Sequence, residues 1–388
     1  MSKEKPITGN EAVSEAMRQI NPDVVAAYPI TPQSSIMEKF AKFVANGVVD
    51  SELITVESEH SAMSATIGAA AAGARAMTAT SSVGLALMFE AVNAASGLRL
   101  PIVMPIVNRA LSAPINIHCD HSDSMACRDA GWIQMYCEDG QEAYENTIMS
   151  IRICEDLKVM TPAMVCQDGF ITSHGVQNTI IYDDASVRKF VGEHKPLFNL
   201  LDVDNPITIG AIELTDYFFE TKRQQVEGME NAVKAFPKVA KEFSKITGHV
   251  YKHVEKYKTD DAEAIIVTMS SAAGTTKTVV DKLRKKGKKV GLLKIRTFRP
   301  FPYKEVGAAL SNAKSVATLD RSFSFGAHAP LYGSVLNSVY CSGISAKLQS
   351  YVFGIGGRDL FDDDIMKTFN DLLTGKVGER EKYLGLRE

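Results

Sequence analysis

The sequence lacks the excess of positive charge that is typical of nucleic-acid-binding proteins. Its 46 aspartate and glutamate residues outnumber its 43 lysine and arginine residues, which gives a net charge of −3. We therefore expect no binding to nucleic acid. No apolar run reaches the roughly 18 residues that a membrane-spanning helix requires. Residues 1–17 also lack the apolar core of a secretory signal, so we expect a cytoplasmic protein that does not contact a membrane.

Cysteine spacing argues against a metal cluster held by this chain. The six cysteines include no Cys-x-x-Cys pair and no iron–sulfur spacing. We expect free thiols in a reducing compartment and no metal site. Any redox centre that the protein uses would then lie on another chain. The P-loop pattern is absent, and the glycines within residues 354–357 do not complete a dinucleotide-binding motif.

Composition and the order of local patterns predict an α/β fold. The 388 residues are 45% hydrophobic and 23% charged, which is typical of a soluble chain of two or three domains. Up to about residue 170, strand-like and helix-like runs alternate, which predicts a parallel sheet with helices on both faces. The expected strands are 24–28, 53–56, 75–80, 101–107, 132–137 and 162–166, and the expected helices include 60–74, 84–96 and 141–155.

The pattern changes in the second half of the chain. Residues 184–206 are mixed and interrupted by proline, which predicts an irregular connection, and residues 216–258 predict one or two exposed helices that bridge domains. A second α/β unit then begins, with expected strands at 264–269, 289–295, 315–319 and 348–352. We therefore predict two units, residues 1–245 with the connecting segment and residues 260–388.

Ligands of parallel sheets bind where strands reach the carboxyl edge, so the residues at those points are site candidates. Glu57 and Glu59 follow one strand and precede a helix. Their carboxylates could be there for the helix dipole alone or to relay a proton in a cleft. Thr31 lies between two prolines in what could be only a rigid turn. Arg109 follows a buried strand, where its charge is costly unless it meets a glutamate or an anionic substrate.

The segment 118–123 has several potential metal ligands within six residues. His118, Cys119, Asp120, His121 and Asp123 are all of the right type. Their spacing matches no known metal motif, and the segment has no clear helical pattern. A polar loop near an active site is therefore favoured over a metal site.

Several short motifs are more specific together than any one of them alone. In chain order they are A-Y-P-I-T-P (27–32), V-E-S-E-H-S-A (56–62), N-R-A-L-S-A-P-I-N (108–116), D-G-F followed by S-H (168–174) and G-G-R-D (356–359). This set resembles the alpha subunit of the multi-subunit 2-oxoacid:ferredoxin oxidoreductases over essentially the whole chain. Within that family it is most similar to the pyruvate:ferredoxin oxidoreductases.

The resemblance implies a fold and a set of residue roles. The first unit would be the pyrimidine-binding domain for thiamine diphosphate, and the second would resemble the C-terminal domain of transketolase. Glu59 would contact N1′ of the aminopyrimidine and share its proton, and Pro29 would line the wall beside that ring. Thr31 and Arg109 would hold the carboxylate of the substrate, where Arg109 can donate charge-assisted hydrogen bonds. The 120–123 loop would lie near the domain surface, without a catalytic role.

The resemblance also implies partners. The chain has no clear diphosphate–magnesium motif, so thiamine diphosphate would be shared with a beta subunit, with Mg²⁺ and 4Fe-4S clusters held by partner subunits. Gamma and delta subunits would complete the complex. The implied reaction converts pyruvate, coenzyme A and oxidised ferredoxin to acetyl-CoA, CO₂ and reduced ferredoxin, and it is reversible.

Other functions remain open at this point. A sister enzyme for branched-chain 2-oxoacids would share Thr31, Glu59 and Arg109, and one methylene changes substrate preference by only about 1–3 kcal/mol. An oxalate enzyme is less favoured, because it should have a further cation near Thr31. The chain could also be a non-catalytic scaffold. A stand-alone thiamine enzyme is opposed by the missing diphosphate-binding half.

Overall fold

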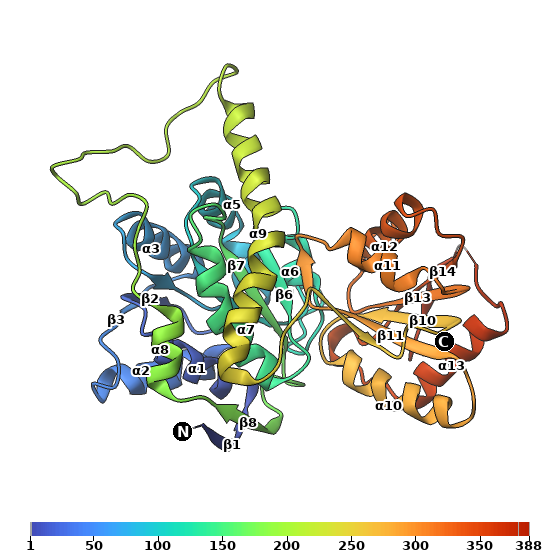
Figure 1. The fold of residues 1–388 in the computed structure, drawn as a ribbon. Helices are drawn as coiled ribbons and strands as arrows, with labels where there is room; N and C mark the ends of the chain where they lie inside the picture. Colours follow the sequence, from blue (N-terminus) through green and yellow to red (C-terminus); the bar gives the residue numbers. More distant parts are fainter. Residues whose placement is uncertain (1, 379, 388) are drawn as a thin grey trace.

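The computed structural model describes residues 2–378 and 380–387, which form two lobes that are each built around a sheet (Figure 1). Within these residues, the sheet of the larger lobe has seven strands in the order β12-β6-β7-β5-β4-β2-β3. All its neighbours are parallel except β12, which is antiparallel to β6. The strands are β2 (Val24–Ala27), β3 (Glu52–Thr55), β4 (Ala76–Met77), β5 (Val103–Asn108), β6 (Ile133–Tyr136), β7 (Ala163–Asp168) and β12 (Thr297–Arg299).

The smaller lobe has its own mostly parallel sheet. Its strands, over the described part of the chain, follow the order β15-β14-β13-β10-β11-β9, and only β9 is antiparallel to its neighbour. They are β9 (Val254–Tyr257), β10 (Ala264–Thr268), β11 (Val290–Ile295), β13 (Ser315–Asp320), β14 (Lys347–Val352) and β15 (Lys382–Tyr383). A separate antiparallel pair joins β1 (Lys3–Thr8) to β8 (Val176–Ile181). The predicted α/β class with parallel sheets is confirmed.

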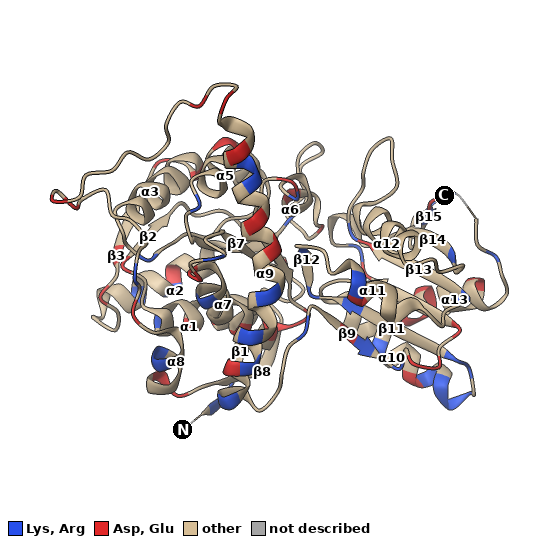
Figure 2. Ribbon diagram, turned by 45° about the horizontal axis from the view of Figure 1, so that its top comes forward, with Lys and Arg blue, Asp and Glu red and all other residues tan. Residues whose placement is uncertain are grey.

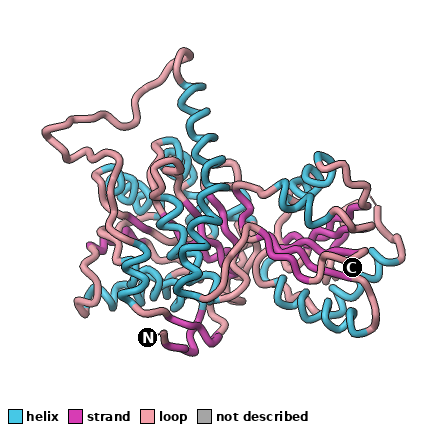
Figure 3. The backbone as a smooth tube through the Cα atoms, in the orientation of Figure 1, coloured by secondary structure: helices cyan, strands magenta, loops and turns pink. Residues whose placement is uncertain are grey.

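Helices cover both faces of the larger sheet (Figure 3). One buried apolar cluster packs one face under α1 (Gly9–Ile20), α2 (Ser34–Ala45), α7 (Gly140–Cys154) and α8 (Asp184–Val191). The other face packs against α3 (Glu59–Ala71), α4 (Ser82–Leu87), α5 (Phe89–Gly97) and α6 (Ser122–Ala126). Every residue of β5 is buried, as expected for a strand covered on both faces.

The smaller sheet is covered in the same way. Its two faces pack against different apolar clusters, one of which continues into the larger lobe through Trp132 and Phe298. The helices are α10 (Ala272–Lys285), α11 (Tyr303–Leu310), α12 (Pro330–Cys341), the 3₁₀ turn η1 (Ile355–Gly357) and α13 (Asp362–Leu373). Among the described residues, no helix is both long and apolar enough to cross a membrane.

The connection between the lobes is more regular than predicted. Residues 184–191 form α8 instead of an irregular segment, because Asp183 caps the helix by accepting from the N–H of Ser186 and Phe190 is buried. Residues 218–247 form one helix, α9 (Phe218–Thr247), which packs a face of small and aromatic residues, including Phe236, against the larger lobe. The remaining loop, 192–217, contacts the larger lobe through Leu200, which donates its N–H to the Ala71 carbonyl, and through Phe198 and Ile209, while the rest of it extends away from the body of the protein with the first turns of α9 (Figure 1).

Two further predictions need correction. The expected helix 84–96 is two helices, α4 and α5, with Met88 outside helical geometry between them. The hydrogen bonds Met88 N–Gly84 O and Val92 N–Met88 O continue across this turn, which explains why the sequence pattern is unbroken. The expected strand 75–80 forms a ladder only at β4, with a single bridge from Thr80 to Ile106. Helix α1 was not predicted, although Thr8 and Glu11 form a capping box at its start.

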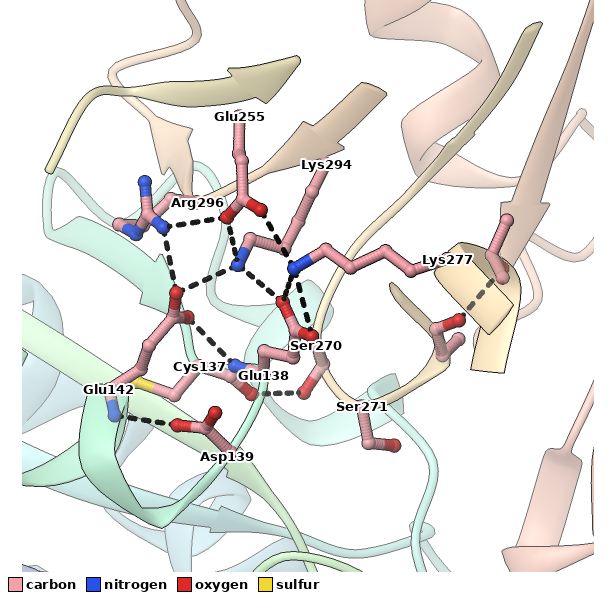
Figure 4. A network of polar contacts seen from close by, with 12 residues as sticks. Cys137, Glu138, Asp139, Glu142, Glu255, Ser270, Ser271, Lys277, Lys294 and Arg296 are labelled. Atoms are coloured by element: carbon pink, nitrogen blue, oxygen red, sulfur yellow. Dashed lines mark hydrogen bonds and ion pairs between the residues drawn. The ribbon is translucent and has the colours of Figure 1, made fainter. Parts of the chain in front are cut away.

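A strand that crosses between the lobes and a cluster of ion pairs connect the two lobes. Residues 297–299 cross from the smaller lobe to the larger one and pair with β6. Beside this crossing, Lys294 is 1% exposed and its ammonium lies 2.5–2.7 Å from carboxylate oxygens of Glu138, Glu142 and Glu255 (Figure 4). Glu138 and Glu142 belong to the larger lobe and the others to the smaller one. The division at residues 245 and 260 stays a prediction.

Candidate active site

Glu59 lies at the start of α3 with its carboxylate buried. Ser58 caps the helix by accepting from the N–H of Ser61, which places Glu59 in the first turn, where the helix dipole favours a negative charge. Only 7% of Glu59 is exposed. Glu57, in contrast, is exposed and accepts a 2.5 Å hydrogen bond from the Ser61 hydroxyl. Across the described residues, no hydrogen bond or ion pair uses the Glu59 carboxylate, so it stays available to a ligand.

Gly84 in α4 lies directly against this carboxylate. A Cβ at position 84 would lie 2.6 Å from Glu59 Oε1 and 2.8 Å from its Cγ. The same point is 2.6 Å from Thr80 Oγ1, a buried hydroxyl that has no hydrogen-bond partner among the described residues. Only glycine therefore lets α4 pack this close to Glu59. Sequence reasoning missed Gly84 and Thr80, because nothing in an apolar helix pattern singles out these two positions.

Arg109 is buried without a carboxylate partner. It is 7% exposed at the end of β5. Its Nη1 donates to the carbonyl of Thr31 at 2.8 Å and its Nε to the carbonyl of Asn116 at 3.1 Å. No ion pair within the described part of the chain includes Arg109, so the alternative of a glutamate partner is not realised. A guanidinium has five N–H donors, and those that remain can hold an anion.

The predicted residues of the first loop lie beside Arg109. Thr31 and Pro29 are both exposed, and the bond from Arg109 to the Thr31 carbonyl brings Thr31 and Arg109 together. A hydrogen bond from α1 holds this loop in place, since Asn10 Nδ2 donates to the Pro32 carbonyl at 2.8 Å. The hydroxyl of Thr31 has no partner among the described residues, so it can still bind a ligand.

Asp123 forms hydrogen bonds with both α4, the helix that contacts Glu59, and the backbone of Arg109. Its carboxylate accepts from the backbone N–H of Ser82, the first residue of α4, at 2.9 Å and from that of Arg109 at 3.0 Å. It also accepts from Asn108 Nδ2 and the N–H of Ser124. Burial raises the pKa of Asp123 to about 6, although these four donors act to lower it. One buried carboxylate thus fixes both the helix that contacts Glu59 and the backbone of Arg109.

The 120–123 loop is therefore buried, which corrects the expectation that it lies near the domain surface. Asp120, His121 and Asp123 are each at most 4% exposed. The loop lies between the lobes, and the backbone N–H of His121 donates to the carbonyl of Arg321 in the smaller lobe. These side chains can be buried because each makes hydrogen bonds, which local sequence spacing does not reveal.

His121 belongs to a polar network that crosses between the lobes. His121 Nε2 lies 2.7 Å from Asp168 Oδ1, and the other oxygen of Asp168 accepts from the N–H of Ser271 at 3.2 Å. Cys119, His121 and Asp168 are close enough to share a metal ion. However, the Arg321 guanidinium lies 3.8 Å from Asp168, and burial raises the pKa of the Cys119 thiol well above its usual value. A cation beside a protonated thiol favours a structural network over a metal site.

Comparisons with known proteins show the family to which the chain belongs. Residues 15–241 match the family model "Pyruvate flavodoxin/ferredoxin oxidoreductase, thiamine diP-bdg", and residues 262–365 match "Pyruvate:ferredoxin oxidoreductase core domain II". The chain is 57% identical to pyruvate synthase subunit PorA of Thermotoga maritima, over 98% of both chains. It is 47% identical to PorA of Methanocaldococcus jannaschii, over 100% of this chain and 99% of that one. Ketoisovalerate oxidoreductase subunit VorA of Pyrococcus abyssi is 42% identical over 99% and 98%.

Solved structures show the same fold at lower identity. A 2-oxoglutarate:ferredoxin oxidoreductase from Magnetococcus marinus matches 95% of this chain with a TM-score of 0.75 and 19% identity, and the chain spans 65% of that protein. A split-gene transketolase matches 95% of this chain and 99% of its own with a TM-score of 0.58 and 12% identity. The resemblance expected from the sequence motifs is thereby confirmed. The chain belongs to the pyruvate flavodoxin/ferredoxin oxidoreductase family.

Proposed function

We propose that this chain is the alpha subunit of a pyruvate:ferredoxin oxidoreductase. The enzyme would convert pyruvate and coenzyme A to acetyl-CoA and CO₂ while reducing ferredoxin, and it would run in reverse as a pyruvate synthase. The observation that carries the proposal is a buried carboxylate and a buried guanidinium at one edge of the sheet, each without an ionic partner among the described residues. Among 2-oxoacids, pyruvate is favoured by the names of the relatives at 57% and 47% identity.

Glu59 fits the role of the residue that binds the pyrimidine of thiamine diphosphate. Its carboxylate is buried in the first turn of α3 and forms no hydrogen bond with any described residue. It can therefore hold a proton shared with the ring nitrogen N1′. Pro29, exposed on the loop after β2, would line the wall beside this ring. When bound, thiamine diphosphate supplies the carbon centre that accepts the electrons released by decarboxylation.

Arg109 and Thr31 would hold the carboxylate of the 2-oxoacid. Arg109 is oriented by two backbone carbonyls, and no described residue uses its remaining donors or the Thr31 hydroxyl, so these can bind a ligand. A charge-assisted hydrogen bond to a carboxylate is roughly twice as strong as a neutral one. This contact would orient the bond that breaks when CO₂ leaves.

Pro29 and Thr31 of the site are exposed, and we propose that a beta subunit covers them. Large apolar side chains of α4 and α5 near Glu59 are exposed: Val83 by 39%, Leu87 by 55% and Phe89 by 44%. Contiguous exposed apolar surface marks interaction sites. The partner would supply the diphosphate and Mg²⁺ contacts of the cofactor and carry a 4Fe-4S cluster. Gamma and delta subunits, with further clusters on the delta subunit, would complete a cytoplasmic complex that reduces ferredoxin.

A second candidate function is the oxidation of branched-chain 2-oxoacids. It is supported by the VorA relative, whose 42% identity is close to the 43% of PorA from the same organism, Pyrococcus abyssi. The catalytic roles of Glu59 and Arg109 would be unchanged. A non-catalytic scaffold is the remaining alternative.

Substrate oxidation by the native complex, purified without oxygen, tests these proposals. Viologen reduction is measured with coenzyme A and either pyruvate or 2-oxoisovalerate at equal concentration. A strong preference for pyruvate supports the main proposal, and the opposite preference supports the branched-chain alternative. Glu59→Gln should reduce turnover by at least about 100-fold, the scale for loss of a proton-transfer group, while Glu57→Gln, its exposed neighbour, should not. Full activity in Glu59→Gln would instead support the scaffold alternative.

A further inference from the structure

The smaller lobe touches the loop that orients Arg109. Between β14 and α13, the backbone turns sharply at Gly354, Gly356 and Gly357, which all have positive φ values of 63–81°. Non-glycine residues seldom adopt this conformation. The turn projects the carbonyl of Gly356 toward the 110–118 loop of the larger lobe, where Asn116 Nδ2 donates to it at 3.1 Å.

Asn116 also contacts Arg109. The backbone carbonyl of Asn116 accepts from Arg109 Nε at 3.1 Å. Residues 112–116 include four consecutive exposed residues, 112–115. Across the described chain, this stretch forms hydrogen bonds with the rest of the protein only through Asn116. Two bonds hold the Asn116 side chain: its Oδ1 accepts from the N–H of His118 at 2.8 Å, and its Nδ2 donates to Gly356, which is the one of these contacts that reaches the smaller lobe.

The contact has no spare room. A Cβ on Gly356 would lie 2.4 Å from Asn116 Nδ2, and a Cβ on Gly357 would lie 2.4 Å from His118 Cβ. The next residue along, Cys119, is held to the same turn by a 2.7 Å bond from the N–H of Gly357 to its carbonyl. Any side chain at Gly356 must displace the side-chain amide of Asn116 and so break its bond to the Gly356 carbonyl.

We propose that Gly356 and Asn116 are positioning residues, through which the smaller lobe sets the orientation of Arg109 for the carboxylate of the 2-oxoacid. Neither residue contacts the substrate; each acts through the carbonyl of Asn116. The proposal rests on the role of Arg109 in binding that carboxylate, which is part of the proposed function. It gives the second lobe a part in substrate binding in addition to its part in folding.

The contacts that run from Gly356 through Asn116 to Arg109 are called the relay below. Substituting Gly356 and a matched glycine elsewhere in the smaller lobe tests it. Gly356→Ala is compared with Gly375→Ala, because Gly375 also has a positive φ, of 74°, but nothing lies within 4 Å of its Cβ position. Both variants strain the backbone, and only the first displaces the side-chain amide of Asn116. In the assembled complex we expect Gly356→Ala to raise the KM for pyruvate about tenfold, the effect of weakening one hydrogen bond to a charged group. The KM for coenzyme A should not change, and Gly375→Ala should match the wild type.

A double-mutant cycle keeps the test valid if Gly356→Ala folds poorly. Asn116→Ala removes the same bond without a clash, so it should raise the KM for pyruvate by a similar factor. In the double variant the two effects should not add, because both act on one contact. Equal KM values in Gly356→Ala and Gly375→Ala, or additive effects in the double variant, would overturn the relay.

The outcome is separable from the proposed function. If the wild-type complex does not oxidise pyruvate, the proposed function fails before the relay is tested. If the wild type is active and Arg109→Lys raises the KM for pyruvate, but Gly356→Ala and Asn116→Ala do not, only the relay is wrong.

Discussion

A methyl group at position 84 tests whether the place of Glu59 matters for catalysis. In Gly84→Ala the new Cβ would lie 2.6 Å from Glu59 Oε1, whereas an ordinary contact begins at 3.4 Å, so the two atoms must separate by a further 3.4 minus 2.6, or about 0.8 Å. A misplacement of about 1 Å can cost roughly 10²-fold in rate, and losing a proton-transfer group costs about 10²–10⁴-fold. We therefore expect kcat to fall by about 10²-fold.

The same substitution should leave the fold intact. Alanine is favoured over glycine inside a helix by roughly 0.5–1 kcal/mol, which offsets part of the local strain. Gly68→Ala is the matched control, because Gly68 lies in α3, the helix that begins at Glu59, and its Cβ position has nothing within 4 Å. Thermal unfolding and anaerobic viologen reduction would be measured for both variants in the assembled complex. Equal kcat values for wild type, Gly68→Ala and Gly84→Ala would refute the reasoning.

Three further predictions concern parts of the structure around the site. Asp123→Asn replaces one acceptor oxygen with an NH2 group, which would face N–H donors. The complex should therefore lose about 1–3 kcal/mol of stability and some affinity for pyruvate. A variant with wild-type unfolding and KM would contradict the role of Asp123. Burial opposes ionisation of Glu142, but Arg296 and Lys294 hold its pKa well below the ordinary 4.5. Glu142→Gln should therefore destabilise by about 3–5 kcal/mol near pH 7, and its deficit in thermal unfolding should shrink as pH falls below 4.5; a pH-independent deficit would argue against the ion cluster. The side chains of Val203, Ile212 and Phe219 are 87%, 93% and 78% exposed. Replacing each of them with serine should change the free energy of unfolding of this chain by less than about 0.5 kcal/mol but reduce co-purification of partner subunits. Unchanged assembly would show that these side chains face solvent.

The last of these predictions follows from the composition of the loop 192–217, which holds Val203 and Ile212 and leads into the first turn of α9, where Phe219 lies. Its part from residue 196 to residue 217 has four acidic residues and no lysine or arginine, and most of its large apolar side chains are exposed. Figure 2 shows acidic segments and no basic ones along this part of the loop. A segment with this much exposed apolar surface is typical of a protein interface.

Those parts of the fold that depend on local pattern could be predicted from the sequence. The helix expected at 141–155 is observed at Gly140–Cys154, and the strand expected at 101–107 is observed at Val103–Asn108. Both have a strong and continuous pattern of burial. The crossing of 297–299 to the larger lobe could not be predicted, because its partner Met135 is about 160 residues away and strand pairing at that distance leaves no local signal.

The site shows the same division between local and distant causes. Spacing places Glu57 and Glu59 at one helix start, and the helix dipole favours both carboxylates. The packing of α4 buries only Glu59. The 120–123 loop resembled a polar surface segment because its partners, Ser82, Arg109 and Asp168, lie elsewhere in the chain. Local sequence therefore identifies the chemical groups of the site, and tertiary packing decides which of them are available to react.

The unpaired charges of the site explain why this chain would work only within a complex. Burying a guanidinium or carboxylate without a partner is unfavourable, yet Arg109 and Glu59 are both buried, and no described residue pairs with either. Their natural partners would be a substrate carboxylate and a protonated ring nitrogen, which would bind at an edge of the sheet beside exposed apolar side chains of α4 and α5. A subunit that covers this edge would exclude water and strengthen both interactions. The features that destabilise the isolated chain are thus the ones that would favour binding of cofactor, substrate and partner together.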